Sequence, residues 1–426
     1  MLDWLGSSKT LDLISSASVV RTVRLNFQKM KRVSTKRRYL DVQQALAHRT
    51  QRGDAVCTPK KRDASALPAA STAPDQVRRV RLFGTASELR KWLQVKQDQG
   101  LISFEVKKRG QVQVNLPSRL DFQDNYERSA VCMEAIRRIS SLRQGSARHS
   151  HHYVSFDHLE SISSSAALVL TAEICRWNDQ FQRLLHARTE NWSPEIFDRL
   201  SQLGFFDLLT QTSVKAPATI EQDGVKFLRY LRGVPTDQTL LRQFGATIRK
   251  MIGGTLSKWA ILSSGLSEAI TNVCHHAYPE QLNYRAVDKH WYLTAAFNPN
   301  DRTLKVVFYD QGLTIPRSLP ASGFKEHVYE WLALNFSPLD HKKDVALVEA
   351  AVEVGRTRTL EKGRGEGLGN FIDFINERGS GYLSIFSGRA LYKYSLDAGS
   401  ASTKTVGFDH RVNGTLVVWK VALEEE

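Results

Sequence analysis

The stretch from Ser264 to Tyr278, SGLSEAITNVCHHAY, constrains the fold of this chain more than any other. Glu268, Asn272 and His276 are spaced four residues apart, so an α-helix would stack their side chains along one face. Apolar residues fill other positions, as an amphipathic helix requires. A carboxylate one turn before an amide suits a magnesium nucleotide: the amide oxygen binds the metal and the carboxylate polarises a water or hydroxyl. A solvated polar helix face is the alternative that this segment alone leaves open.

A predicted strand lies further along the chain and ends in an acidic turn. Residues 304–309 (LKVVFY) alternate and are rich in β-branched and aromatic side chains, and Asp310-Gln311-Gly312 follows directly. The glycine leaves room beside the carboxylate for a flat heterocycle. A third segment, 363–369 (GRGEGLG), places glycines just before an amphipathic run at 370–376. Free backbone N–H groups and the helix dipole hold phosphates well at such a position.

In this order the three segments resemble the N, G1 and G2 boxes of the GHKL superfamily of Bergerat-fold ATPases. They are most similar to those of the anti-sigma-factor serine kinases, whose helix reads E-A-x-x-N-x-x-x-H-A-Y, as residues 268–278 do. The resemblance covers roughly residues 222–423 and includes a closing strand at 414–419. It implies an α/β fold of the α+β sandwich type that binds ATP and Mg²⁺.

The resemblance assigns a role to each residue that matches a motif. Glu268 would be the general base and Asn272 the Mg²⁺ ligand. Asp310 would accept a hydrogen bond from the adenine amino group, while Gly312 lets the base approach and Thr415 completes the adenine pocket. The phosphates would be held by the glycine box, at Arg364, Gly365, Gly367, Leu368 and Gly369. One position departs from the family: Thr314 stands where a second glycine is usual, which predicts a stiffer turn on the adenine side.

Residues 81–212 alternate predicted strands and helices, which indicates an α/β unit. The expected elements are a strand and turn at 114–116, a helix at 127–140, a buried strand at 153–156, and a Ser-rich turn and apolar helix within 158–181. Residues 194–209 are expected to form a helix, a stop at Gly204 and a short docking segment. This pattern resembles a STAS domain, the fold of anti-sigma-factor antagonists, which carries a regulatory serine at the start of a helix. Ser163, Ser164 and Ser165 lie in that place, and phosphorylation and helix capping both explain them.

Positive charge is concentrated in residues 1–80, which we interpret as a basic arm and linker. Between Arg21 and Val80 the chain has 15 lysines and arginines against four aspartates, a net charge of +11 out of +15 for the whole protein. Residues 58–74 are rich in Pro, Ala and Ser, as linkers are. The part at 21–62 suits non-specific contact with nucleic acid or an acidic partner, and a solvated tail explains it equally well.

Several other classes of protein and site are disfavoured by the sequence. No apolar run approaches the roughly 20 residues that span a bilayer, and the N-terminus does not look like a signal peptide. The four cysteines are far apart and form no CxxC motif, which fits reduced thiols in a cytoplasmic protein. His149, His151 and His152 have no carboxylate or cysteine nearby, so they predict a polar loop rather than a metal site.

A second basic group precedes the glycine box. Arg356, Arg358, Lys362 and Arg364 are expected in a loop. There they would either belong to a mobile lid that closes over the triphosphate or remain solvated.

These features lead to a division into an arm (1–80), a STAS-like regulatory domain (81–212) and a GHKL ATP-binding domain (213–426). No histidine occurs between His186 and His275, which argues against a sensor histidine kinase, and the chain ends soon after the closing strand, where gyrase-like relatives continue. We therefore expect an ATP-binding regulatory protein whose nucleotide state controls contact with a protein partner, with slow ATPase or Ser/Thr kinase activity. The alternative is an ATP-gated homodimeric clamp that holds nucleic acid through its arm.

Overall fold

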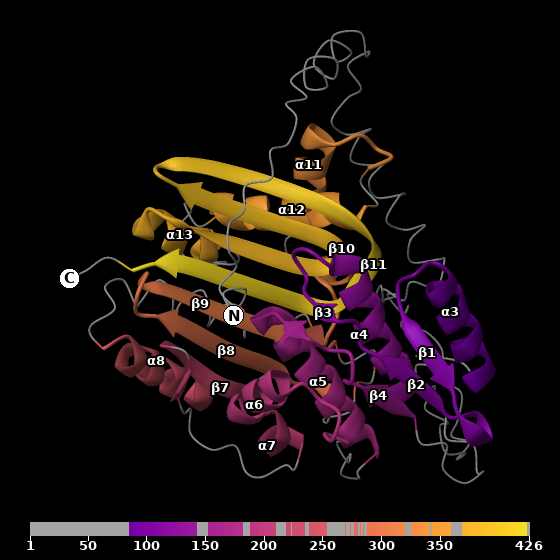
Figure 1. Ribbon diagram of the computed structural model, residues 1–426. Helices are drawn as coiled ribbons and strands as arrows, with labels where there is room; N and C mark the ends of the chain where they lie inside the picture. Colours follow the sequence, from indigo (N-terminus) through magenta and orange to yellow (C-terminus); the bar gives the residue numbers. More distant parts are fainter. Residues whose placement is uncertain are drawn as a thin grey trace, which may run out of the picture.

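The computed structural model describes residues 85–142, 152–181, 188–209, 219–222, 224–234, 238–253, 288–319, 325–340, 343–358 and 369–423, together with residues 269, 273, 277–279, 282 and 284. Helices and strands both occur along the whole described part of the chain (Figure 1). The expectation of a mixed α and β protein is therefore confirmed in this general form.

A six-stranded antiparallel sheet lies at the centre of the molecule (Figure 1). The strands follow the order β10-β11-β9-β8-β7-β6. Their bounds are Thr219–Gln222 for β6, Val225–Gly233 for β7, Trp291–Asn298 for β8, Thr303–Asp310 for β9, Gly381–Asp397 for β10 and Ser400–Ala422 for β11. The predicted strand at 304–309 is thus confirmed as β9. The closing strand expected at 414–419 is longer than predicted, because β10 and β11 form one long hairpin.

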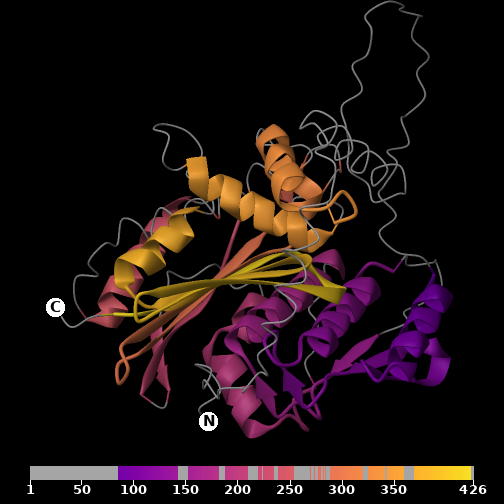
Figure 2. The same cartoon turned by 90° about the horizontal axis from the view of Figure 1, so that it is seen from above.

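Both faces of this sheet are covered. The central strands β8 and β9 are buried along almost their whole length, so apolar or aromatic side chains occur at consecutive positions instead of every second one. Since successive side chains of a strand point to opposite faces, such a strand needs a packing layer on each side. Figure 2 shows the two layers above and below the sheet.

Helices that lie after β7 in the chain form the first of these layers, which we call the helix layer. Its members are α8 (Gln238–Ile252), α10 (Ile315–Ser318), α11 (Lys325–Asn335), α12 (Asp344–Arg358) and α13 (Gly369–Arg378). Phe244 of α8 and Ile375 of α13 pack against Trp291, Phe308 and Trp419 of the sheet in one hydrophobic cluster. Burial of each such side chain stabilises the fold by about 1.5–3 kcal/mol.

One expectation about the helix layer is wrong. Arg356 and Arg358 were assigned to a loop before the glycine box, but they belong to the last turn of α12. The run DVALVEAAVEV contains no Pro, and the helix continues through Gly355 into the two arginines. Lys362 and Arg364 lie outside the described residues.

The second layer is formed by residues 85–209, which we call the middle region. Its helices are α3 (Ala86–Asp98), α4 (Tyr126–Ser140), α5 (Ser164–Phe181), α6 (Pro194–Gln202) and α7 (Phe205–Leu209), with a short 3-10 turn η3 at Lys108–Gly110. The strands are β1 (Ser103–Val106), β2 (Val112–Asn115), β3 (Arg119–Leu120), β4 (Tyr153–Ser155) and β5 (Ser161–Ile162). They form a sheet of order β1-β2-β4 and a β3-β5 pair, in which β2 with β4 and β3 with β5 are parallel.

Most elements predicted for the middle region are present. The helix at 127–140 corresponds to α4, the apolar helix within 158–181 to α5, and the helix interrupted by Gly204 to α6 and α7. Gly204 has φ +89°, the left-handed conformation in which glycine commonly ends a helix. The strand at 153–156 is half-buried over 153–155 rather than buried, because β4 lies at the edge of its sheet and pairs, among the described strands, with β2 alone.

The middle region packs on the face of the central sheet opposite the helix layer (Figure 2). Helices α4 and α5 contact β9 and β11, and their apolar side chains share one hydrophobic cluster with Tyr292, Val307, Tyr309 and Leu416 of the sheet. The core is therefore continuous across the expected domain boundary at residue 212.

The remaining expectations concern membranes and thiols. None of the described helices has both the length and the apolar character of a membrane span. Cys132 and Cys175 are buried free thiols, and burial raises the pKa of each to about 12.

Candidate functional site

Asp310, the predicted adenine acceptor, is the last residue of β9. It lies between Trp291 of β8 and Thr415 of β11 in the sheet register, and only 4% of its surface is exposed. Leu304, Val306 and Phe308 of the same strand pack in the core of the helix layer. Because side chains alternate along a strand, Asp310 points to that same face. The strand thus presents one carboxylate at the edge of an apolar layer.

The environment of Asp310 favours the protonated, uncharged form of its carboxyl group. Burial raises the pKa of Asp310 to about 7, although the N–H of Gly312, the charge of Arg137 and the N–H of Thr415 oppose this shift. The N–H of Gly312 donates to Asp310 Oδ1 at 2.9 Å. Among the described residues, no ion pair includes Asp310. A buried carboxylate without a cation is a favourable partner for an incoming N–H donor.

Gly312 joins the acidic turn to the segment that was predicted to carry the polar helix face. A Cβ atom at Gly312 would lie 2.4 Å from the carbonyl oxygen of Ala277, closer than any side chain tolerates. The N–H of Leu313 donates to that same oxygen at 2.7 Å. Glycine was expected here so that a base can approach, and the structure adds a second requirement, close packing against Ala277. Two motifs separated in the sequence are therefore adjacent.

Three of the described residues within the segment at 264–278 are buried at regular spacing. Ala269, Val273 and Ala277 are four residues apart and at most 5% exposed, and they pack in the core of the helix layer. The predicted base Glu268 and metal ligand Asn272 each precede one of these residues, but both lie outside the described residues. No group of three or more potential metal ligands occurs in the part of the chain that the structure describes.

Thr415 stands beside Asp310 as predicted, and it brings two residues that the motifs did not identify. Ser387 of β10 is fully buried, and its Oγ lies 3.1 Å from Thr415 Oγ1 while it accepts a hydrogen bond from the N–H of Ile315 at 2.8 Å. Gly414 has φ +90°, and a Cβ there would lie 1.9 Å from the carbonyl oxygen of Asp310. The sequence signal for this close approach was the glycine that begins the predicted closing strand.

Position 314 carries threonine where the family pattern has glycine, and the backbone conformation at this position does not require glycine. Its φ of −70° is open to every residue, and it is buried at the start of α10. Of the glycine box, Gly369 begins α13, while Arg364, Gly365, Gly367 and Leu368 lie outside the described residues.

A buried polar cluster lies on the opposite face of the sheet, directly behind Asp310. Glu173 of α5 accepts hydrogen bonds from Arg137 of α4, from Gln311 Nε2 at 3.1 Å and from the Tyr309 hydroxyl at 3.0 Å. The sequence analysis missed these residues. A single glutamate inside the apolar run AALVLTAEICRW was a usable signal, since carboxylates are almost never buried unpaired.

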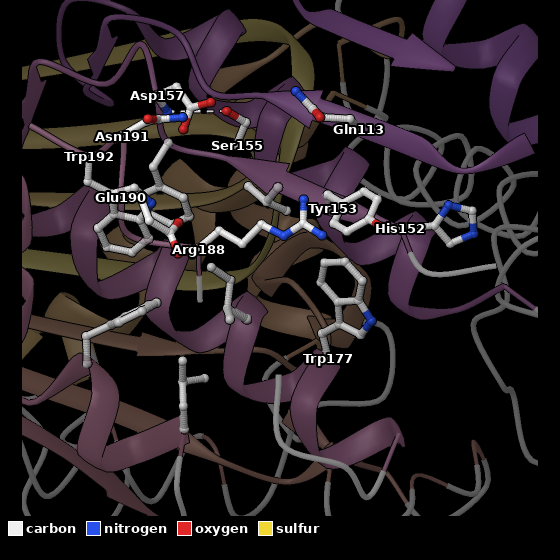
Figure 3. Close-up of a pocket in the computed structure, with 15 residues that line it drawn as sticks. Gln113, His152, Tyr153, Ser155, Asp157, Trp177, Arg188, Glu190, Asn191 and Trp192 are labelled. Atoms are coloured by element: carbon white, nitrogen blue, oxygen red, sulfur yellow. Dashed lines mark hydrogen bonds between the residues drawn. The ribbon is translucent and has the colours of Figure 1, made fainter. Parts of the chain in front are cut away.

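A separate cavity of about 360 Å³ lies in the middle region (Figure 3). Aromatic side chains, among them Tyr153, Trp177 and Trp192, form much of its wall, and Arg188 extends into it with its guanidinium 4.8 Å from the Tyr153 ring centre. Trp177 belongs to α5 and lies one helical turn after Glu173. None of the predicted site residues lines this cavity.

The serine and histidine clusters of the middle region also have definite structural roles. Ser163 Oγ accepts a hydrogen bond from the N–H of Ala166 at 3.3 Å, the arrangement of a helix N-cap, while Ser164 and Ser165 are buried. The capping interpretation is therefore favoured.

His152 Nδ1 accepts a hydrogen bond from the N–H of Val112 at 3.2 Å, and the other two histidines of the cluster lie outside the described residues.

Comparison of the chain with models of protein families, with curated proteins and with solved structures gives no match.

Proposed function

We propose that this chain is an adenine-nucleotide-binding regulatory protein of the GHKL class. The observation that carries the proposal is the buried carboxylate of Asp310 at the end of β9, which has no ion-pair partner among the described residues. Two further features support it: Gly312 and Leu313 hold the acidic turn against Ala277, and Thr415 lies beside Asp310 on the next strand. These are the relative positions that a Bergerat-type adenine pocket needs.

The arrangement of layers supports the same class. One face of the antiparallel sheet carries the helix layer, and Asp310 of β9, which pairs with Thr415 of β11, points to that face. The middle region has parallel strand pairs followed by the helices α4 and α5, with Ser163 at the start of α5, which supports a STAS-like unit. We propose that nucleotide state controls the contact of this protein with a protein partner.

Each residue of the motif set has a role in this proposal. Asp310 accepts a hydrogen bond from the adenine amino group. Asn272 would bind Mg²⁺, which would neutralise phosphate charge. Glu268 is the general base toward a water or a Ser/Thr hydroxyl, so the chemistry is slow ATP hydrolysis or protein phosphorylation. The glycine box at 363–369 supplies N–H groups to the phosphates.

An equilibrium titration of the full chain with ATP and Mg²⁺ tests the nucleotide site. Asp310→Asn should weaken binding roughly 10- to 100-fold, because a buried hydrogen bond to a charged group contributes about 1.5–3 kcal/mol. Asp397→Asn is the matched control, since Asp397 also ends a strand of the sheet but is exposed. Equal affinity of the wild type and Asp310→Asn would remove the basis for the assignment.

The reaction is tested separately with ATP labelled on its γ-phosphate. Label on protein indicates a kinase, and label only in free phosphate indicates an ATPase. Glu268→Ala should keep ATP bound and lower either rate by roughly 100-fold or more. A wild-type rate in Glu268→Ala would rule out this residue as the base.

A further inference from the structure

We propose that Glu173 of the middle region is a positioning residue for Asp310, so that the middle region sets how well the site recognises adenine. This inference rests on the proposed function, because it gives Asp310 the role of adenine acceptor. The starting observation is the cluster behind the strand end, in which Glu173 contacts the residues on both sides of Asp310.

The contacts of Glu173 fix its carboxylate in one place. Its side chain is 1% exposed and forms a two-point contact with Arg137, whose Nη2 and Nε lie 2.7 Å and 3.0 Å from the two carboxylate oxygens. Burial would raise the pKa of Glu173, but the charge and hydrogen bonds of Arg137, the charge of Arg176 and the hydrogen bond from Gln311 bring it below its usual range. A doubly bonded Arg–carboxylate pair of this kind defines direction as well as distance.

The backbone of β9 and the turn after it connects the residues bonded to Glu173 with Asp310. Tyr309 and Gln311 point toward the middle region, and Asp310 between them points to the helix layer. The three residues share two peptide planes, and a peptide plane is rigid, so anchoring both neighbours restricts the backbone of Asp310. The N–H of Gln311 also donates to the Tyr278 hydroxyl at 3.2 Å, which holds this residue from a second direction.

The hydrogen bonds around Glu173 also extend to β11, the second strand of the site. The single proton of the Tyr309 hydroxyl is shared between Glu173 and the carbonyl oxygen of Asn413, which is 2.6 Å away. The Asn413 side chain donates to Glu134 of α4 at 2.7 Å. Since Asn413 lies two residues before Thr415, helices α4 and α5 hold both β9 and β11 where they border the site.

A buried ion pair contributes little net stability, because desolvation of both charges offsets their attraction. Its effect here is better explained as geometric. A comparable pair, Asp179 with Arg232, joins α5 to β7, two strands away from β9. Asp179 is also buried, and its partner Arg232 belongs to a strand that is not adjacent to β9. This pair provides a matched control.

The test compares the binding of ATP with that of purine riboside triphosphate, which lacks the 6-amino group. The ratio of the two affinities measures the contact with Asp310 alone. The wild-type chain should prefer ATP by roughly 10- to 100-fold and Asp310→Asn should lose most of this preference. Glu173→Gln should lower the preference at least about threefold, while Asp179→Asn should leave it unchanged.

The ratio of the two affinities distinguishes a loss of positioning of Asp310 from a general structural defect. If Glu173→Gln weakens both nucleotides equally, or leaves the ratio at the wild-type value, the positioning role is wrong. If the wild type shows no preference, or Asp310→Asn retains it, the proposed adenine site is wrong and this inference falls with it. Should Glu173→Gln fail to fold, Tyr309→Phe removes one contact of the cluster and should still lower the ratio.

Discussion

The two faces of the central sheet are both buried, but they hold their carboxylates in opposite ways. On the face of the middle region, Glu173 is bonded to Arg137, and its pKa is below the usual range despite the burial that would raise it. On the face of the helix layer, Asp310 has N–H partners but no described ion pair, and burial raises its pKa to about 7. Glu173, which has its own cation, serves to join parts of the fold. Asp310, which has no described cation, is available to bind a ligand.

The largest effect is expected where the paired carboxylate loses its cation. Arg137→Met leaves Glu173 buried and unpaired, so the free energy of unfolding should fall by about 3–5 kcal/mol. Chemical denaturation of the nucleotide-free chain measures this change. Arg119→Met is the control, because the Arg119–Asp124 pair is exposed and its loss should cost about 1 kcal/mol or less. Equal losses in the two variants would contradict the comparison.

Asp310→Asn should have the opposite effect on stability. Folded Asp310 has its pKa near 7, above the ordinary value of 3.8, so the folded protein binds more protons than the unfolded chain between these pH values. Wild-type stability therefore falls as the pH rises from about 4 to 7. At pH 8 the nucleotide-free variant should be more stable than wild type by about 1–3 kcal/mol, since one pKa unit corresponds to roughly 1.4 kcal/mol.

Denaturation at pH 5 and pH 8 checks this prediction. The difference between variant and wild type should shrink at pH 5, where Asp310 is already protonated. A variant that is less stable than wild type at pH 8 would show that the carboxylate is structurally satisfied, as Glu173 is. The variant should combine weaker ATP binding with higher stability, as expected when a site residue is not optimised for folding.

Lys305 tests whether the face of the middle region tolerates a buried charge that forms no ion pair among the described residues, although the charge of Asp121 acts on it. By strand alternation it lies on the same face as Tyr309, and burial lowers its pKa to about 8. The folded protein then binds fewer protons than the unfolded chain between about pH 8 and 10.5, so stability rises with pH in that range. At pH 7, Lys305→Met should stabilise the protein by about 1–2 kcal/mol in denaturation experiments. A destabilised variant would indicate that the ammonium group has a compensating partner.

The smallest effect is expected from Tyr309→Phe. The variant loses one hydroxyl, while Glu173 keeps its bonds to Arg137 and Gln311. The free energy of unfolding should fall by about 0.5–1.5 kcal/mol, the usual value of one hydrogen bond. A loss as large as that of Arg137→Met would mean that the hydroxyl, rather than the guanidinium, holds the cluster together.

Local patterns in the sequence predicted single elements better than the contacts between them. The alternation of 304–309, the Asp-Gln-Gly turn and the helix of 127–140 are each encoded within a short stretch of sequence, and all were recognised. The pairing of Glu173 with Arg137 joins two helices at residues 36 apart, and no local period reports such a contact. The long β10–β11 hairpin was recognised only at its end, because the residues of β10 were not assigned to a strand. Close packing at Gly312 was likewise not predictable, since it depends on where Ala277 lies in space.

A structure of the full chain with a non-hydrolysable ATP analogue tests the central claim most directly. The account predicts the adenine ring between the sheet and its helix layer, with the 6-amino nitrogen within roughly 3 Å of an Asp310 carboxylate oxygen. The aromatic cavity beside Arg188 in Figure 3 is a rival location for a planar anionic ligand. An analogue bound in that cavity, with Asp310 contacting no part of it, would contradict the account.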